Sequence, residues 1–280
     1  MSGSEQLAWE RENRTRYALA AFASGLGSLV SVVITLAFVG RGGGNERTGL
    51  IRIHEHQAQL LISLAAQAVA VFFLMAALYY LVRGIVARRP EQLRFLWPLL
   101  VAAPVVLTIG AVLTQINLGD LADEFVSKGA QTNARAKDLV ADRNKASGIL
   151  ASAGTLILAL SYVLVSVNAM RAGLLSRFMG VLGIVSGALL ILPLLPGGGS
   201  VVQLFWVVAL GLLYLDRWPN GRGPAWEVAE AVPWPTAAEQ REPRSEPPPT
   251  DPVVPAEERA AQPTQAARRQ RSRKKKKRRR

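Results

Sequence analysis

Cysteine is absent from the 280-residue sequence, and only two histidines occur in it. Without cysteine the chain has no disulfide, thiolate metal site, iron–sulfur cluster, thioether-linked haem or cysteine nucleophile. The phosphate-binding loop and the glycine fingerprint of dinucleotide-binding enzymes are missing as well. We therefore expect a protein without a cofactor and without enzymatic activity.

Aspartate, glutamate, lysine and arginine are absent from five long apolar runs and from the apolar part of a sixth, residues 201–215. A helix that crosses the hydrocarbon of a bilayer needs ~20 mostly apolar residues, and its backbone groups must be hydrogen-bonded within the segment. The predicted spans are residues 17–39, 59–82, 95–116, 146–170, 178–196 and 199–217. The sequence therefore predicts an all-α, polytopic transmembrane bundle with six spans.

Ionisable residues at membrane depth usually mark proton relays, coupled ion sites and voltage sensors. Their absence from the apolar runs counts against a proton-coupled pump, a voltage sensor and a haem-bearing electron carrier. Uncharged polar residues remain, among them Gln115, Asn168 and Gln203. Such groups more often form hydrogen bonds between helices than bind substrate, but with Pro104 in the third run they leave a small-solute carrier open.

Arginine and lysine near the apolar runs predict the orientation. The short segments on the side of the N-terminus carry an excess of arginine, whereas the loop 117–145 balances its bases with acids. Because basic residues are enriched on the cytoplasmic side, we expect both termini inside the cell. The predicted organisation is a cytoplasmic segment 1–16, a transmembrane domain 17–218 and a tail.

The tail has two parts. Residues 219–267 are rich in proline, glutamate and alanine and hold too few large apolar residues for a core, so we expect a disordered linker, with Trp226 and Trp234 near lipid headgroups. Residues 268–280 form a polybasic tip without acids: Arg268, Arg269, Arg271, Arg273, Lys274, Lys275, Lys276, Lys277, Arg278, Arg279 and Arg280. We expect the tip to contact anionic lipid headgroups. Nucleic acid is a less favoured partner, because the tip has no aromatic residue for base stacking.

Small residues recur at the spacing that lets membrane helices approach closely. The pattern occurs in the first, fourth and fifth runs, and its glycines are Gly25, Gly27, Gly148, Gly154, Gly183 and Gly187. We expect these glycines to lie at contacts between helices within the bundle. The pattern alone predicts no oligomeric state.

His54, Glu55 and His56 form the only histidine cluster, directly before the second run. In an extended segment, residues two apart point the same way, so both imidazoles are candidate metal ligands, with an acid such as Asp123 completing the site. Spacing identifies no third ligand, and a polar turn at the membrane surface is the simpler interpretation.

The stretch 169–187, which reads AMRAGLLSRFMGVLGIVSG, is followed by an apolar hairpin and by DRWPNG at residues 216–221. These motifs resemble a family of multi-pass membrane proteins of high-GC bacteria, a domain of unknown function. The resemblance covers about a quarter of the chain. It implies a bacterial plasma membrane, and it transfers no activity, ligand or catalytic residue.

Three functions remain open from the sequence. The first is a non-enzymatic membrane bundle whose tail binds anionic lipid or another polyanion. The second is a carrier or channel for a small neutral or apolar solute. The third, supported least, is a metal-dependent membrane enzyme that uses His54 and His56.

Overall fold

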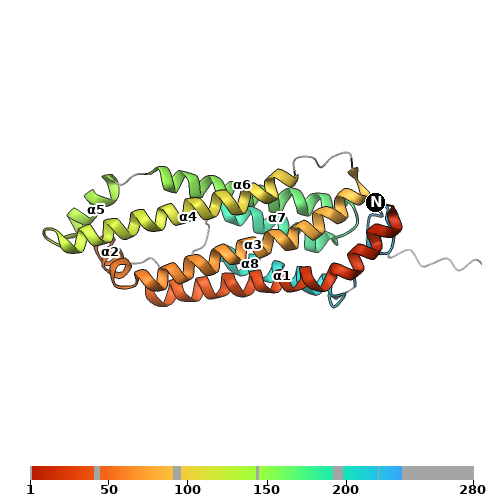
Figure 1. The fold of residues 1–280 in the computed structure, drawn as a ribbon, viewed down its shortest axis with the longest axis horizontal. Coiled ribbons are helices and arrows are strands. Elements are labelled where there is room, and N and C mark those ends of the chain that lie inside the picture. The colour runs from red at the N-terminus through yellow and green to blue at the C-terminus, as the bar shows by residue number, and fades with distance from the viewer. Residues whose placement is uncertain are drawn as a thin grey trace, which may run out of the picture. The chain divides into compact units, whose positions relative to one another are not determined.

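The computed structural model describes residues 2–40, 45–90, 96–142, 145–191, 198–219 and 221–234, with residues 198–200 by their backbone only. These residues form helices and no strands (Figure 1), so the all-α prediction is confirmed for them. The elements are α1 Gly3–Phe38, α2 Glu46–Glu55, α3 Gln57–Arg88, α4 Leu96–Ser127, α5 Asn133–Asp142, α6 Ala146–Arg171, α7 Arg177–Ile191, α8 Gly198–Tyr214 and a 3₁₀ turn, Pro224–Trp226. The polybasic tip and the linker beyond residue 234 lie outside the described residues.

Four helices, α1, α3, α4 and α6, are long and apolar enough to cross a bilayer. They have 36, 32, 32 and 26 residues. Large apolar side chains on them face away from the protein, for example Leu26, Val101 and Ile149, which are 64, 67 and 69 % exposed. Helices with so much apolar outer surface are stable in lipid and not in water. The four helices contain the first four predicted spans to within one residue and are consistent with a membrane-embedded protein.

The long helices pack as two antiparallel pairs, α1 with α3 and α4 with α6 (Figure 1). Glycine lets the two backbones of each pair approach closely. A Cβ atom at Gly27 of α1 would lie 3.0 Å from the carbonyl oxygen of Ala66 of α3. A Cβ at Gly110 of α4 would overlap the backbone of Ala151 of α6. Helix pairing therefore depends on these positions remaining small.

Hydroxyl groups also connect α1 to α3. Ser63 Oγ lies 2.9 Å from Ser31 Oγ and 3.0 Å from Thr35 Oγ1, and it donates a hydrogen bond of 3.0 Å to the carbonyl oxygen of Ser31. Hydrogen bonds between membrane helices contribute about 0.6 kcal/mol each on average. This cluster therefore adds modestly to the packing of the first pair.

The remaining glycines of the predicted pattern differ in their surroundings. Gly25 faces α8, and Gly154 faces the backbone of α4. Gly183 and Gly187 face α6. Gly148 is an exception to the prediction, because a Cβ there would have no atom within 4 Å. Its surface borders an open groove and not a neighbouring helix.

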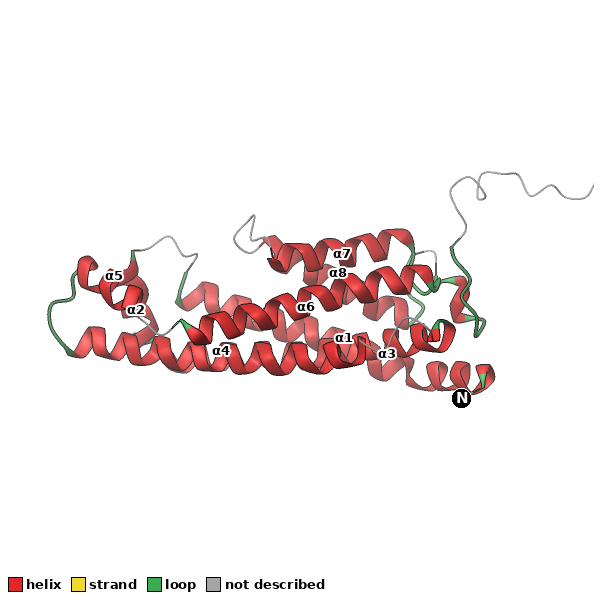
Figure 2. Ribbon diagram, turned by 90° about the horizontal axis from the view of Figure 1, so that it is seen from above, coloured by secondary structure: helices red, strands yellow, loops and turns green. Residues whose placement is uncertain are grey.

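Helices α7 and α8 cover residues 177–191 and 198–214 of the predicted spans 178–196 and 199–217, and residues 192–196 of the fifth predicted span lie outside the described residues. They have 15 and 17 residues. At ~1.5 Å per residue the described parts of these helices extend about 22 and 26 Å, whereas the hydrocarbon core is ~30 Å thick. They pack on α6 and α1 in the half of the bundle nearer to the N-terminus (Figures 1 and 2). Helix length therefore supports four spans and does not by itself establish the fifth and sixth.

The other end of the bundle carries α2 and α5 (Figure 2). Leu50 of α2, Ala136 of α5, and Ala122 and Phe125 near the end of α4 form a small separate core there. Arg135 of α5 donates hydrogen bonds to the carbonyl oxygens of Phe125 and Glu124, at 3.0 and 3.2 Å. The Glu124 carbonyl also accepts from the backbone N–H of Lys128 at 3.1 Å, so Arg135 adds to the hydrogen bonding of carbonyl groups at the end of α4. The connecting helices within each pair, α2 between α1 and α3 and α5 between α4 and α6, thus pack together at this end.

At the N-terminal end, α1 begins with a reciprocal cap. Ser2 Oγ accepts a hydrogen bond from the backbone N–H of Glu5, and the backbone N–H of Ser2 donates to Glu5 Oε2 at 2.7 Å. This hydrogen bond to its ionised form lowers the pKa of Glu5. The cap explains why α1 starts well before its apolar run.

Candidate functional site

A buried ion pair joins α1 to α3 at the N-terminal end of the bundle. Arg88 donates from Nη1 to Glu10 Oε1 at 2.6 Å and from Nη2 to Glu10 Oε2 at 3.0 Å. The side chain of Arg88 is fully buried, and that of Glu10 is 2 % exposed. Gln6 donates a further hydrogen bond to Glu10 Oε1, at 2.9 Å. Both charges are thus compensated in a place that excludes water, as a buried ion pair requires.

Arg88 also binds the segment that follows α8. Its Nε and Nη2 donate to the carbonyl oxygen of Ala225 at 2.9 and 2.7 Å. The neighbouring Trp226, which is 5 % exposed, donates from its indole nitrogen to the carbonyl oxygen of Leu174 at 2.9 Å. One guanidinium therefore connects α1, α3 and residues 221–234, and we call Glu10, Arg88, Ala225 and Trp226 the clasp.

Aromatic rings surround the clasp and centre on Tyr80, which is fully buried. Its ring stacks on those of Tyr17 and Trp226 at centroid distances of 5.0 and 5.5 Å. Its hydroxyl donates to the carbonyl oxygen of Glu10 at 2.7 Å and lies 3.2 Å from Nη2 of Arg222. The guanidinium of Arg222 in turn covers the ring of Trp226 at 4.3 Å. We call residues 221–234 the docked segment. Ring stacking and cation–π contacts with Trp226 stabilise it by more free energy than the burial of apolar area alone would give.

The sequence had predicted that a disordered linker starts at Pro219 and that Trp226 lies among lipid headgroups. The structure instead places residues 221–234 against the bundle, where the ring of Trp226 contacts Tyr80 of α3 and Tyr214 of α8. This segment is ordered because the carbonyl oxygen of Ala225 accepts hydrogen bonds from the buried guanidinium of Arg88. The composition of the segment does not reveal that contact. The side chains of Glu10, Arg88 and Trp226 are hydrogen-bonded within the protein, so the clasp holds residues 221–234 against the bundle.

The predicted metal ligands do not converge. His54 lies in α2 and His56 ends it, so helical geometry directs the two rings apart. His54 Nδ1 lies 2.7 Å from Asp123 Oδ1, whereas the His56 ring contacts Phe38 at a centroid distance of 5.1 Å. Gln57 donates to the same Asp123 oxygen at 2.6 Å. Within the part of the chain that the structure describes, no three histidine or acidic side chains gather as a metal site requires.

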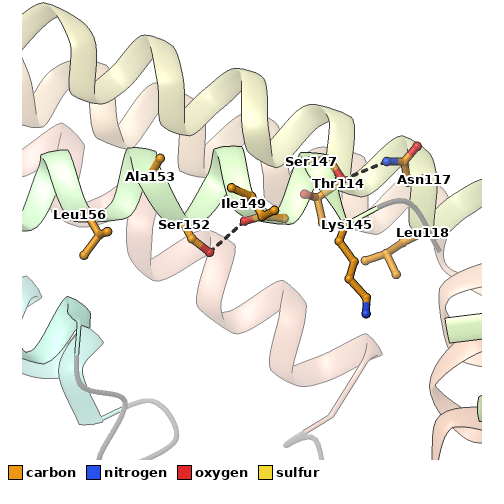
Figure 3. A pocket seen from close by; sticks show the side chains of 10 residues that line it. Thr114, Asn117, Leu118, Lys145, Ser147, Ile149, Ser152, Ala153 and Leu156 are labelled. Carbon is orange, nitrogen blue, oxygen red and sulfur yellow. Dashed lines mark hydrogen bonds between the residues drawn. The ribbon is translucent and has the colours of Figure 1, made fainter. Parts of the chain in front are cut away.

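A groove of ≈500 Å³ lies between α4 and α6 near the α2–α5 end (Figure 3). One end is polar: Asn117 Nδ2 donates to Ser147 Oγ at 2.9 Å, and Lys145 lies beside them. The other end is apolar and reaches Leu156. The groove is open along one side, where Ile149 is exposed. It is thus an amphipathic surface and not an enclosed chamber.

Gln115, Asn168 and Gln203, the polar residues on which the carrier hypothesis depended, do not line this groove. Asn168 donates to the carbonyl oxygen of Leu164 in its own helix at 2.8 Å. Gln203 donates to the hydroxyl of Tyr162 at 2.8 Å and so links α8 to α6. Both amides therefore serve helix structure and packing, the more common role of such groups.

Comparisons with protein-family models, with curated proteins and with solved structures found no match. The resemblance to multi-pass membrane proteins of high-GC bacteria therefore remains a prediction. The sites that the structure brings together are the clasp and the groove.

Sequence reasoning missed both. Glu10 and Arg88 lie just beyond the apolar runs, where charged residues are common and were not expected to be buried. A signal was nevertheless present, because Trp9 adjoins Glu10 and Tyr80 precedes Arg88 by about two helical turns. Aromatic residues beside charges at the ends of two spans are a pattern that favours contact between those ends.

Proposed function

We propose that this chain is a non-enzymatic membrane anchor that crosses a bacterial plasma membrane six times and presents its polybasic tail to anionic lipid headgroups on the cytoplasmic side. The single observation that carries the proposal is the clasp. It attaches residues 221–234, the start of the tail, to the same end of the bundle as the N-terminus.

The close approach of the two segments supports the shared side. A Cβ at Gly3 of α1 would lie 2.7 Å from the Cβ of Ala229. The tail therefore leaves from the N-terminal end whether α7 and α8 cross the bilayer completely or only enter it as a hairpin. The charge of the tail then supports the cytoplasmic side but does not distinguish six crossings from four.

Charge near the bundle ends supports the orientation. Basic residues outnumber acidic ones around the N-terminal end, where Arg83 and Arg171 end their apolar runs. At the α2–α5 end, acids and bases are about balanced. Arginine is enriched on the cytoplasmic side of membrane proteins, so the proposal places the N-terminal end inside.

The absence of native cysteine makes the tail directly testable. Ser272→Cys places the only thiol of the chain in the tip, where an environment-sensitive dye reports headgroup contact in reconstituted vesicles. We expect the signal in vesicles that contain phosphatidylglycerol and not in pure phosphatidylcholine. It should fall between 0.1 and 1 M salt, as the screening length shortens from ~10 to ~3 Å.

The matched control carries the same Ser272→Cys label with the eleven basic residues of the tip changed to glutamine. Equal signals from the tip and its control, or a signal insensitive to both salt and lipid charge, would refute headgroup contact. Binding of single-stranded RNA without a response to phosphatidylglycerol would assign the tip to nucleic acid instead.

A further inference from the structure

We propose that the groove between α4 and α6 binds one phospholipid with an anionic headgroup, its acyl chain lying along α6 and its phosphate at Lys145. The groove lies at the α2–α5 end of the bundle, opposite the clasp. The proposed site does not depend on the tail binding lipid.

The length of the groove fits one leaflet. Its lining on α6 runs from Lys145 to Leu156. Eleven residues of helix extend about 16 Å, roughly half of the ~30 Å hydrocarbon thickness. The polar end lies where the predicted spans 95–116 and 146–170 meet the membrane surface, so the groove is oriented as a lipid is, polar outside and apolar inside.

The space in the groove comes from Gly148. A Cβ at this position would have no atom within 4 Å, so the absence of a side chain leaves room that no other helix fills. Ile149 and Leu156, which line the groove on one face of α6, are 69 and 51 % exposed. Apolar side chains around an open strip on a membrane-spanning helix are the surface that an acyl chain contacts.

The polar end has the chemistry to select a phosphate. Lys145 forms no ion pair among the described residues, and as the N-cap of α6 it makes no side-chain cap hydrogen bond. The positive end of the α6 dipole therefore adds to the lysine charge. Thr114, Asn117 and Ser147 make this end of the groove polar.

The headgroup and not the chain must supply selectivity. All membrane lipids offer acyl chains, so exchange of one lipid for another yields little net burial. A basic residue at a membrane surface contributes ~1 kcal/mol toward an anionic lipid, which is about a fivefold preference. We expect the groove to prefer phosphatidylglycerol over phosphatidylcholine of the same chains by about this factor.

Native mass spectrometry of the full-length chain can count bound lipids during titration with phosphatidylglycerol or phosphatidylcholine. Lys145→Gln should lower the phosphatidylglycerol preference about fivefold. Its control, Lys128→Gln, removes the same charge at the same end of the bundle, outside the groove. Because both variants retain the tail, tail-bound lipid affects them equally.

Gly148→Leu should remove one bound lipid of either kind by filling the groove. Its control, Gly49→Leu, makes the same change where a Cβ also has no atom within 4 Å. Retention of the lipid by Gly148→Leu, or the same lipid preference in Lys145→Gln and Lys128→Gln, would overturn the proposal. Inorganic phosphate that displaces phosphatidylglycerol selectively would show a phosphate site without a chain site, and would overturn it as well.

Discussion

Replacing Arg88 with methionine is the perturbation that bears most directly on the clasp. Methionine retains an unbranched apolar chain but removes every donor, and so both bonds to Glu10, both to Ala225 and one to the carbonyl oxygen of Gly84. The Glu10 carboxylate would remain buried, with Gln6 as its donor. Loss of one partner of a buried ion pair costs about 3–5 kcal/mol.

This free energy sets the size of the expected effect. For a chain of this size, 1 kcal/mol corresponds to about 2–4 °C in melting temperature, so Arg88→Met should lower the melting temperature in detergent by roughly 10 °C. Replacing both partners, with Glu10→Gln added, should recover much of this loss because no buried charge then lacks a counterion. A melting temperature equal to that of the unmodified protein, or losses that simply add in the double variant, would refute the reasoning.

A second readout separates the ion pair from the docked segment. Ala225 is fully buried, so a cysteine introduced there should react slowly with a thiol reagent in an otherwise cysteine-free chain. Adding Arg88→Met should accelerate labelling, because the segment loses two hydrogen bonds. Adding Glu10→Gln should accelerate it less, because the guanidinium can still bind the carbonyl of residue 225. Equal labelling rates in the two variants would contradict the role assigned to Arg88.

Other positions test the packing. Gly110→Val should lower the melting temperature strongly, because its side chain would overlap the backbone of Ala151, whereas Gly49→Val has open space and should have little effect. Ser63→Ala should cost about 0.6 kcal/mol per lost interhelical hydrogen bond, measured as a small shift in thermal unfolding. Trp226→Phe keeps an aromatic ring but loses the indole donor, so it should cost about 1 kcal/mol and speed limited proteolysis of residues 221–234.

The four long helices follow from local chemistry. An apolar run without charge has one stable form in lipid, so α1, α3, α4 and α6 could be predicted with their approximate positions. The sequence does not predict how far these helices extend beyond the hydrocarbon, because that extension depends on hydrogen bonds and ion pairs with distant residues. In α1 the first turns are stabilised by the Ser2 cap and by Glu10 binding to Arg88.

The clasp illustrates what composition leaves out. Arg88 and Ala225 are 137 residues apart, and neither lies in a segment whose pattern indicates burial. Only the fold shows that one guanidinium can satisfy a carboxylate and a carbonyl together. The metal site weighed as an alternative at His54 and His56 fails for a different reason, because it needed an extended segment where the chain forms α2.

The central claim, six crossings with both termini on one side, can be tested with three single cysteines and a membrane-impermeant maleimide. Thr48→Cys marks α2, Ser200→Cys the first turn of α8, and Val232→Cys the docked segment. The account predicts that Thr48→Cys and Ser200→Cys react from one side of the membrane and Val232→Cys from the other. Labelling of Ser200→Cys only from the side of Val232→Cys, or only after detergent is added, would contradict six crossings and leave a four-span protein with a membrane-inserted hairpin.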